Sequence, residues 1–245
     1  MKVRVSALAF ALGTLIARAT HGAGGFGSPV VVTGLDLGEP GVDVASDGTI
    51  YVNAPAGLLS NGALTFTNVP VSAPSSADTT RAFPVVASGG NGTLHAVWLE
   101  VVGTASSRVR YARSADWGAS WTVPTTLISV GASVYPWVAA RGSKVSVTSY
   151  HTDAAGTPDT VAEGSQWFES YLESIDGGTT FSPLAVIDSV AVKSGPICTQ
   201  GTGCSADREL LDFQSVTLDG AGRANAVWTR SIDGVSDTEI RFARQ

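Results

Sequence analysis

The chain has 245 residues and a formal net charge of −6, because 21 Asp and Glu outnumber 15 Lys and Arg. An acidic chain without a cluster of basic residues is a poor partner for a phosphate backbone, so we expect no nucleic-acid partner. The 28 Gly, the 11 Pro, the low share of charged residues (15%) and the many Val, Thr and Ser predict an all-β protein with frequent turns. No stretch keeps apolar residues at helical spacing for three turns, which argues against a helical protein.

The first 23 residues have the pattern of a secretory signal peptide. Lys2 and Arg4 precede a nearly apolar run over residues 5–16, and small residues suited to cleavage follow, up to Ala23. The apolar run is too short for a membrane-spanning helix. Cleavage after Ala23 would leave residues 24–245 as a single domain with a formal charge of −9. We therefore expect a protein that is secreted or held in the periplasm or cell envelope, with no membrane span after cleavage.

Strand-like segments follow one another along the rest of the chain, in units that begin near residues 40, 84, 136 and 212. The second unit is the clearest, with strands predicted at 84–88, 94–100, 108–113 and 121–128 and a Gly-rich turn after the first. The remaining predicted strands, in chain order, are 29–33, 40–43, 50–52, 135–138, 145–150, 167–173, 222–228 and 240–244. The stretch 182–204 has room for a degenerate fifth unit.

Two of these units also match in sequence. Residues 92–98 correspond to 222–228 at an offset of 130, and residues 109–113 correspond to 240–244 at an offset of 131. Each unit is one supersecondary element that cannot bury both of its faces alone and needs its neighbours to complete a core. Four-stranded antiparallel units in series are typical of propeller blades.

One short phrase occurs twice, 60 residues apart, each time after a predicted strand. Both copies have the pattern Ser-x-Asp-x-Gly-x-Ser/Thr-aromatic, and we call them the first Asp turn (114–121) and the second Asp turn (174–181). A short Asp side chain can accept hydrogen bonds from the backbone of a tight turn, and Gly permits a positive φ there. We expect a structural role for the residues of this pattern, namely Ser114, Asp116, Gly118, Trp121, Ser174, Asp176, Gly178 and Phe181.

The two Asp turns resemble the Asp box, or bacterial neuraminidase repeat, of sialidase-type β-propellers. The resemblance implies an all-β propeller of four-stranded antiparallel blades, of which four are visible in the sequence and a fifth can be hidden in 182–204. The sialidases that show this pattern have six blades, so this chain would be reduced. The last unit lacks a fourth strand, and strand 29–33 has no hairpin partner. We therefore expect strand 29–33 to close the propeller by pairing with the C-terminal blade over 238–244.

The two cysteines, Cys198 and Cys204, lie in one Gly-rich loop. In an exported chain such a pair predicts a disulfide that closes a small loop. A metal site is the rival interpretation, but neither His nor a further Cys lies nearby to complete four ligands. We expect neither a metal nor a cofactor.

In sialidases the ligand pocket lies on the face opposite the Asp boxes, where three Arg clamp the substrate carboxylate, a Tyr assisted by Glu is the nucleophile and an Asp is the acid/base. A guanidinium group matches a carboxylate with two hydrogen bonds, and a phenol needs a nearby base to attack. The residues expected at that face are Glu39, Arg81, Glu100, Tyr150, His151, Asp153, Arg208, Glu209, Asp212 and Arg230. Those that supply the residue types of a pocket are Arg81, Tyr150, Arg208, Glu209 and Arg230.

None of these residues lies in a matching catalytic motif. The Arg-Ile-Pro signature of the family is only faintly echoed by residues 81–84, which carry one extra residue before the Pro. The catalytic residues are therefore left unassigned, and the more ordinary role of each Arg is a solvated rim or a salt bridge. We expect a protein that binds a glycan or an extracellular protein without catalysis. The alternatives are an exo-acting glycoside hydrolase of the exo-α-sialidase type and, third, a structural or assembly factor of the cell envelope.

Overall fold

The structure is a computed structural model that describes residues 41–44, 50–54, 57–61, 66–210, 212, 214–233 and 237–245, with side chains from residue 69 onward. The described residues all belong to one compact unit, residues 32–245. The predicted signal peptide, the predicted strand 29–33 and Glu39 lie outside the described residues.

The described secondary structure consists of strands, apart from one 3-10 turn at Gly201–Gly203. The first sheet contains β1 (Gly41–Val44), β2 (Ile50–Ala54), β3 (Gly57–Asn61) and β4 (Phe66–Val69). The second contains β5 (Val85–Gly90), β6 (Thr93–Val102), β7 (Ser106–Ser114) and β8 (Thr125–Ile128). The third contains β9 (Ala132–Arg141), β10 (Lys144–Thr152), β11 (Gln166–Ser174), β12 (Ala185–Val186) and β13 (Lys193–Ser194), and the fourth β14 (Ser215–Leu218), β15 (Ala224–Ser231) and β16 (Thr238–Arg244).

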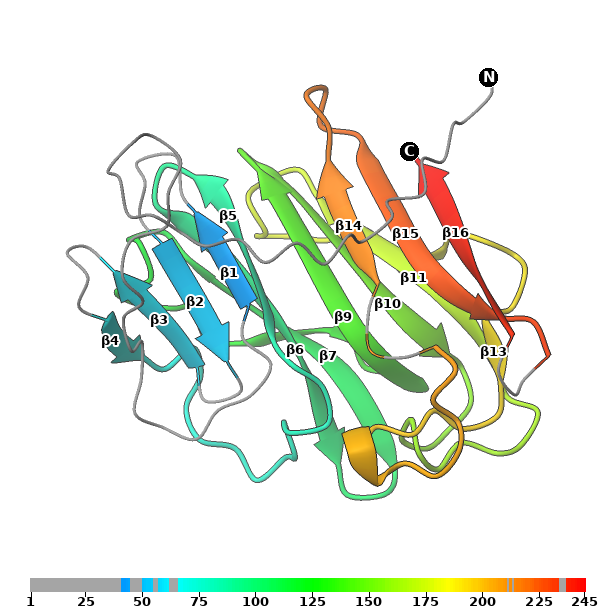
Figure 1. The fold of residues 1–245 in the computed structure, drawn as a ribbon. Coiled ribbons are helices and arrows are strands. Elements are labelled where there is room, and N and C mark those ends of the chain that lie inside the picture. The colour runs from blue at the N-terminus through cyan, green and yellow to red at the C-terminus, as the bar shows by residue number, and fades with distance from the viewer. Residues whose placement is uncertain are drawn as a thin grey trace, which may run out of the picture. The chain divides into compact units, whose positions relative to one another are not determined.

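The four sheets follow one another in chain order (Figure 1). Every pairing between named strands is antiparallel, and each sheet is built from successive hairpins. The first strand of each sheet contacts the first strand of the next, since β1 contacts β5, β5 contacts β9 and β9 contacts β14. The fold is therefore all-β and antiparallel, and this arrangement is consistent with a β-propeller-like fold. The blade number and the closure by strand 29–33 stay predictions.

Two predicted segments differ from the structure. The fourth strand of the second sheet, predicted over 121–128, begins at Thr125, because the preceding Pro124 has no N–H to donate to a ladder. Residues 182–204 form no sheet of their own. Their two short strands, β12 and β13, both pair with β11 and so extend the third sheet.

The cores lie between neighbouring sheets and follow the two-residue period of the strands. On β6, Leu94, Ala96 and Trp98 face one way and pack with Val86 and Ala112. From the other side of β6, Val97 packs with residues of β7, β9, β10 and β11. Because both faces are covered, β6 is buried almost throughout, and apolar residues stand on both of its faces.

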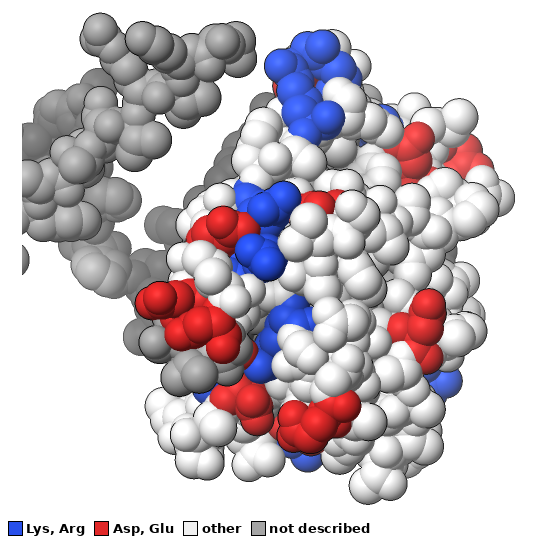
Figure 2. Space-filling view, turned by 90° about the vertical axis from the view of Figure 1, so that its right-hand side faces the viewer, with Lys and Arg blue, Asp and Glu red and all other residues white. Residues whose placement is uncertain are grey.

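The surface combines both signs of charge. On the side shown in Figure 2, Lys and Arg lie next to Asp and Glu rather than in a single-sign patch. Ion pairs formed by residues of the fourth sheet and its first turn include Arg230–Glu239, Arg241–Glu239 and Arg244–Asp219. Within the described part of the chain, no helix is long and apolar enough to cross a bilayer.

Candidate functional site

The two Asp turns have the same hydrogen-bond geometry. In the first, the Ser114 hydroxyl donates to Asp116 at 2.7 Å, and Asp116 accepts from the Ser120 backbone N–H at 2.9 Å. In the second, Ser174 donates to Asp176 at 2.7 Å, and Asp176 accepts from the Thr180 N–H at 2.9 Å.

The aspartates of both turns bond within the turn, and the closing aromatic residues pack beside the sheets. The hydroxyl and N–H of Ser120 hold the pKa of Asp116 at about 2, below its usual range. Trp121 packs against the core beside β6, and Phe181 meets Tyr111 edge-on at 4.9 Å between ring centroids. We therefore propose that the residues of the Asp turns are structural.

The Asp turns lie beside the hairpin turns of their sheets. The Trp117 N–H donates to the Gly92 carbonyl in the β5–β6 turn at 2.9 Å, and the Gly177 N–H donates to the Ser143 carbonyl in the β9–β10 turn at 2.8 Å. At the opposite end of the sheets, the chain enters the first strand of each sheet, namely β5, β9 and β14. A cavity of about 590 Å³ lies at that end.

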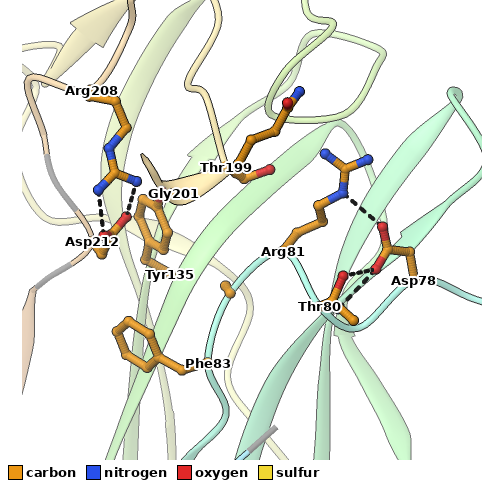
Figure 3. A pocket seen from close by; sticks show the side chains of 11 residues that line it. Asp78, Thr80, Arg81, Phe83, Tyr135, Thr199, Gly201, Arg208 and Asp212 are labelled. Carbon is orange, nitrogen blue, oxygen red and sulfur yellow. Dashed lines mark hydrogen bonds and ion pairs between the residues drawn. The ribbon is translucent and has the colours of Figure 1, made fainter. Parts of the chain in front are cut away.

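The cavity combines charged and aromatic side chains from segments far apart in the sequence (Figure 3). Residues 78–83 before β5 supply one wall, Tyr135 of β9 another, and the disulfide loop with the segment before β14 the third. The lining residues are Asp78, Thr80, Arg81, Ala82, Phe83, Tyr135, Thr199, Gln200, Gly201, Arg208 and Asp212.

Asp78 shapes the first wall and holds Arg81. It accepts hydrogen bonds from the Thr80 N–H and hydroxyl at 2.9 and 2.7 Å, and Arg81 Nε donates to it at 2.7 Å. Burial raises the pKa of Asp78, but the hydrogen bonds from Arg81 and Thr80 outweigh it, so the pKa is lowered overall. The carboxylate therefore stays ionised beside the guanidinium group.

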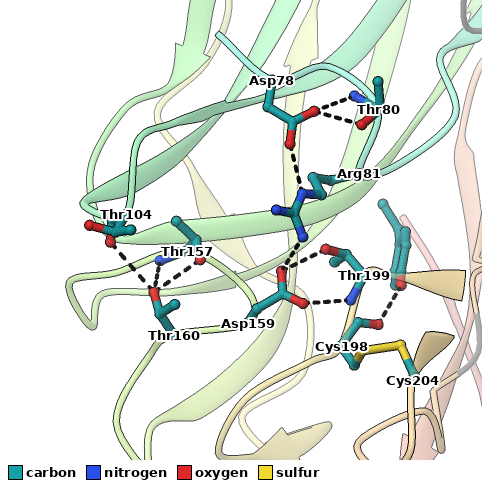
Figure 4. Close-up of polar contacts among 11 residues, drawn as sticks. Asp78, Thr80, Arg81, Thr104, Thr157, Asp159, Thr160, Cys198, Thr199 and Cys204 are labelled. Carbon is teal, nitrogen blue, oxygen red and sulfur yellow. Dashed lines mark hydrogen bonds and ion pairs between the residues drawn. A yellow bond between two sulfur atoms is a disulfide. The ribbon is translucent and has the colours of Figure 1, made fainter.

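A second carboxylate joins Arg81 to the disulfide loop (Figure 4). Arg81 Nη1 lies 3.7 Å from Asp159, which accepts from the Thr199 N–H at 2.9 Å and from the Thr199 hydroxyl at 2.6 Å. The disulfide predicted between Cys198 and Cys204 is present and closes this loop. The disulfide and the two hydrogen bonds from Thr199 to Asp159 thus hold the wall that Thr199, Gln200 and Gly201 contribute.

Arg208 and Asp212 form the opposite wall. The guanidinium group donates two parallel hydrogen bonds to the carboxylate, at 2.8 and 2.7 Å. This geometry is the strongest form of an Arg–carboxylate pair.

Tyr135 lies between the two walls in a strained backbone conformation. Its φ is +51°, which L-residues rarely adopt, and the Gln214 side chain donates to its carbonyl at 2.6 Å. Burial and the nearby Asp212 raise the pKa of the Tyr135 hydroxyl well above its usual range, so this phenol is neutral. Backbone outliers of this kind often mark functional sites.

Only two of the five pocket candidates from the sequence, Arg81 and Arg208, line this cavity. Tyr150 is fully buried, with its hydroxyl donating to the Thr229 carbonyl at 3.3 Å and accepting from the Thr229 N–H at 3.1 Å. Glu209 is buried in an ion pair with Lys193. Arg230 donates to Glu239 and to the Ala191 carbonyl. The structure therefore does not gather the five residues into one site.

His151, expected at the same face, lies in a separate chain of polar contacts. Its Nδ1 is 3.1 Å from the Ser133 hydroxyl and its Nε2 is 3.3 Å from Asp153. Ser133 is fully buried, so this arrangement offers no accessible nucleophile. Among the described residues no group of three or more His, Cys, Asp or Glu could hold a metal ion.

The sequence singled out neither Asp78, Phe83, Tyr135 nor Thr199 as residues of a site. Two signals were nevertheless present. Phe83 follows Arg81 in the segment that precedes a predicted strand, and Tyr135 opens another predicted strand. Segments that lead into the first strands of neighbouring sheets come together at one end of those sheets, which is where the cavity lies.

Comparisons with known proteins give low similarity throughout. Neither a family model nor a curated protein matches the chain. Among solved structures, the NanB sialidase from Streptococcus pneumoniae has a TM-score of 0.46 at 10% identity, covering 83% of this chain and 30% of that one. An intramolecular trans-sialidase from Ruminococcus gnavus has a TM-score of 0.41 at 10% identity, with coverage of 83% and 42%.

A polysaccharide lyase that acts on ulvan has a TM-score of 0.48 at 13% identity, covering 86% of this chain and 56% of that one. The chain thus spans roughly a third to a little over half of the length of these three structures. Similarities at this level do not assign the chain to a family.

Proposed function

We propose that this protein binds a glycan in the cavity between Arg81 and Arg208 without cleaving it, as a secreted or cell-envelope protein. The proposal rests on the composition of the cavity. Two Arg–Asp ion pairs face a space of about 590 Å³ that Phe83 and Tyr135 also line. A cavity of this size suits a small ligand, and its few charged groups suit recognition by hydrogen bonds.

The chemistry of a sugar fits this combination of groups. A pyranose ring carries hydroxyl groups that both donate and accept hydrogen bonds. Guanidinium and carboxylate groups held rigidly beside each other supply the complementary donors and acceptors.

The positions of the other candidates favour binding over a sialidase-type reaction. A tyrosine nucleophile needs a free hydroxyl beside a base. The Tyr150 hydroxyl makes two hydrogen bonds with the Thr229 backbone, and the Glu209 carboxylate is paired with Lys193. Arg230 is absent from the described lining of the cavity, so two arginines rather than three face it.

Glycan binding can be tested with a glycan array, followed by calorimetric titration of the bound glycan. We expect Arg208→Met to weaken binding about tenfold or more, because the pair with Asp212 is lost. Arg230→Met is the matched control, since Arg230 also pairs with a carboxylate, Glu239, but outside this cavity, and it should leave the affinity unchanged. A folded protein that binds no glycan, or equal losses in the two variants, would contradict the proposal.

Catalysis is tested on the same samples with a fluorogenic sialoside. Our proposal predicts no turnover. Turnover that disappears in Arg208→Met and persists in Arg230→Met would instead support the exo-α-sialidase alternative and place the substrate in this cavity.

A further inference from the structure

The charges around the cavity bear on the kind of glycan that it can accept. Arg81 is bound on two sides, with Nε on Asp78 at 2.7 Å and Nη1 at 3.7 Å from Asp159 (Figure 4). Two of the three nitrogens of its guanidinium group thus already face a carboxylate. A ligand carboxylate that accepted from the Nη atoms would lie beside the carboxylates of Asp78 and Asp159, which repel it.

Arg208 is engaged even more completely. Both Nη atoms donate to the two oxygens of Asp212 in parallel (Figure 3). This is the geometry that a ligand carboxylate would need for itself. An acidic ligand that approached these two donors would therefore compete with Asp212 for them.

The sum of charges also disfavours an acidic ligand. Three carboxylates, those of Asp78, Asp159 and Asp212, surround two guanidinium groups, which leaves one negative charge in excess. An added carboxylate would face like charge, and any Asp that it displaced would lose its partner.

A neutral hydroxyl group meets no such obstacle. It can donate to a carboxylate oxygen while it accepts from the neighbouring guanidinium N–H, and so bridges an Arg–Asp pair without breaking it. Two adjacent hydroxyl groups on one sugar ring can do this twice. Phe83 and Tyr135 also line the cavity, but with only 9% and 2% of their surface exposed they contribute little to the contact area.

We propose that the cavity selects neutral sugars, bound through pairs of adjacent hydroxyl groups, over sugars that carry a carboxylate. This inference rests on the proposed function, because it names the ligand class of the same cavity. It predicts a binder whose affinity changes little with salt, since no net charge is brought to the site.

The test is calorimetric titration of the purified protein with four probes at low and high salt. The neutral probes are a glucose hexasaccharide and a mannose hexasaccharide, and the acidic probes are hexagalacturonic acid and sialyllactose. We expect at least one neutral probe to bind, and both acidic probes to bind about tenfold more weakly or worse than it. The affinity for the neutral probe should change less than about twofold between low and high salt.

Acidic probes that bind as tightly as the neutral ones, or more tightly, would overturn this inference and leave glycan binding intact. A folded protein that binds none of the four, and no glycan on an array, would overturn the proposed function and the inference with it. The two failures are therefore distinguishable.

A pair of variants tests the role of the carboxylates directly. Asp212→Asn keeps the size of the side chain but removes the excess negative charge and releases Arg208. We expect it to weaken binding of the neutral probe about tenfold and to bring the affinities for acidic and neutral probes closer together. Glu239→Gln makes a comparable change at an ion pair that lies outside the cavity, and it should alter neither value. An unchanged acid-to-neutral ratio in folded Asp212→Asn would overturn the selection mechanism.

Discussion

The hydroxyl group of Tyr111, on β7, packs so closely over Gly178 of the second Asp turn that a β-carbon on Gly178 would lie 1.7 Å from the hydroxyl oxygen. The same hydroxyl is 2.7 Å from Nδ1 of the buried His95. Gly178 also has a φ of +80°, which favours glycine. The glycine of this turn is thus required twice, once by its own backbone and once by the neighbouring sheet.

Replacing Gly178 with Ala should therefore destabilise the protein more than a positive φ alone explains. We expect a loss of about 3 kcal/mol, the sum of an unfavourable left-handed conformation and a steric overlap with Tyr111. The matched control is Gly142→Ala, because Gly142 has a φ of +58° but has open space where a β-carbon would lie. That variant should lose about 1 kcal/mol in urea denaturation. Equal losses in the two variants would show that the contact with Tyr111 contributes nothing.

Local patterns are enough to predict much of the fold. The strands of the second and third sheets, the hairpin turns, the two Asp turns and the short disulfide loop each depend on residues close together in the sequence. Alternation, glycine position and cysteine spacing report such features directly. The predicted strand 84–88, for instance, corresponds to β5 within two residues at its C-terminal end.

Which residues line the cavity depends on strand register and on contacts between distant segments, and a single sequence displays neither. The sequence places Tyr150 at the end of a strand, but β10 continues to Thr152, and a register shift between Thr148 and Tyr150 affects its pairing with β9. Tyr150 consequently lies in the core. Arg208 and Glu209 are adjacent in sequence, yet Arg208 lines the cavity while Glu209 is buried with Lys193. The direction in which each of these side chains points is decided by packing between segments that are distant in the sequence.

The first Asp turn should weaken in acid. The hydrogen bonds that lower the pKa of Asp116 to about 2 stabilise its ionised form in the folded state, relative to an ordinary value of 3.8. A depressed folded-state pKa contributes stability above the unfolded value, and that contribution is lost as the pH falls from about 4 toward about 2. Asp116→Asn, which cannot ionise, should melt below the wild type at neutral pH, and the difference should narrow over this window. A melting difference that stays constant down to pH 2 would contradict this account.

Glu169 on β11 should make the protein less stable as the pH rises. The residue is fully buried opposite Tyr150 on β10, and among the described residues neither of its carboxyl oxygens has a hydrogen-bond partner. Burial raises the pKa of Glu169 well above 4.5, and the nearby Thr148 hydroxyl offsets only part of that rise. The group is therefore protonated when folded and ionised when unfolded above about pH 4.5.

Because the pKa of Glu169 is raised in the folded state, its contribution to stability is fully present below the unfolded-state pKa. That contribution is lost as the pH rises toward the folded-state pKa. The slope from this single group is at most about 1.4 kcal/mol per pH unit. Glu169→Gln removes the titration while keeping the shape, so the variant should gain stability relative to the wild type between about pH 5 and pH 8. Urea denaturation across this range measures the difference. Parallel stability curves for the two proteins would exclude an elevated pKa.

Lys193 and Glu209 form a buried ion pair whose side chains are only 2% and 1% exposed, and Asp207 lies 3.6 Å from the same amine. Breaking such a pair from one side leaves an unpaired charge in the interior, whereas replacing both members by apolar residues often costs little. Lys193→Met should therefore lower the free energy of unfolding by about 3 kcal/mol or more, and Lys193→Met combined with Glu209→Met should recover most of that loss.

Glu209 of this pair directly follows Arg208 in the sequence, so loss of the pair also tests how the cavity wall is held. If Glu209 anchors the segment, the double variant should be nearly as stable as the wild type and yet bind the glycan more weakly, because the apolar replacement fixes the backbone around Arg208 less strictly than an ion pair does. Denaturation and titration on the same sample separate the two effects. A double variant with wild-type affinity would show that the Arg208–Asp212 pair holds its own position, and that Lys193 serves stability alone.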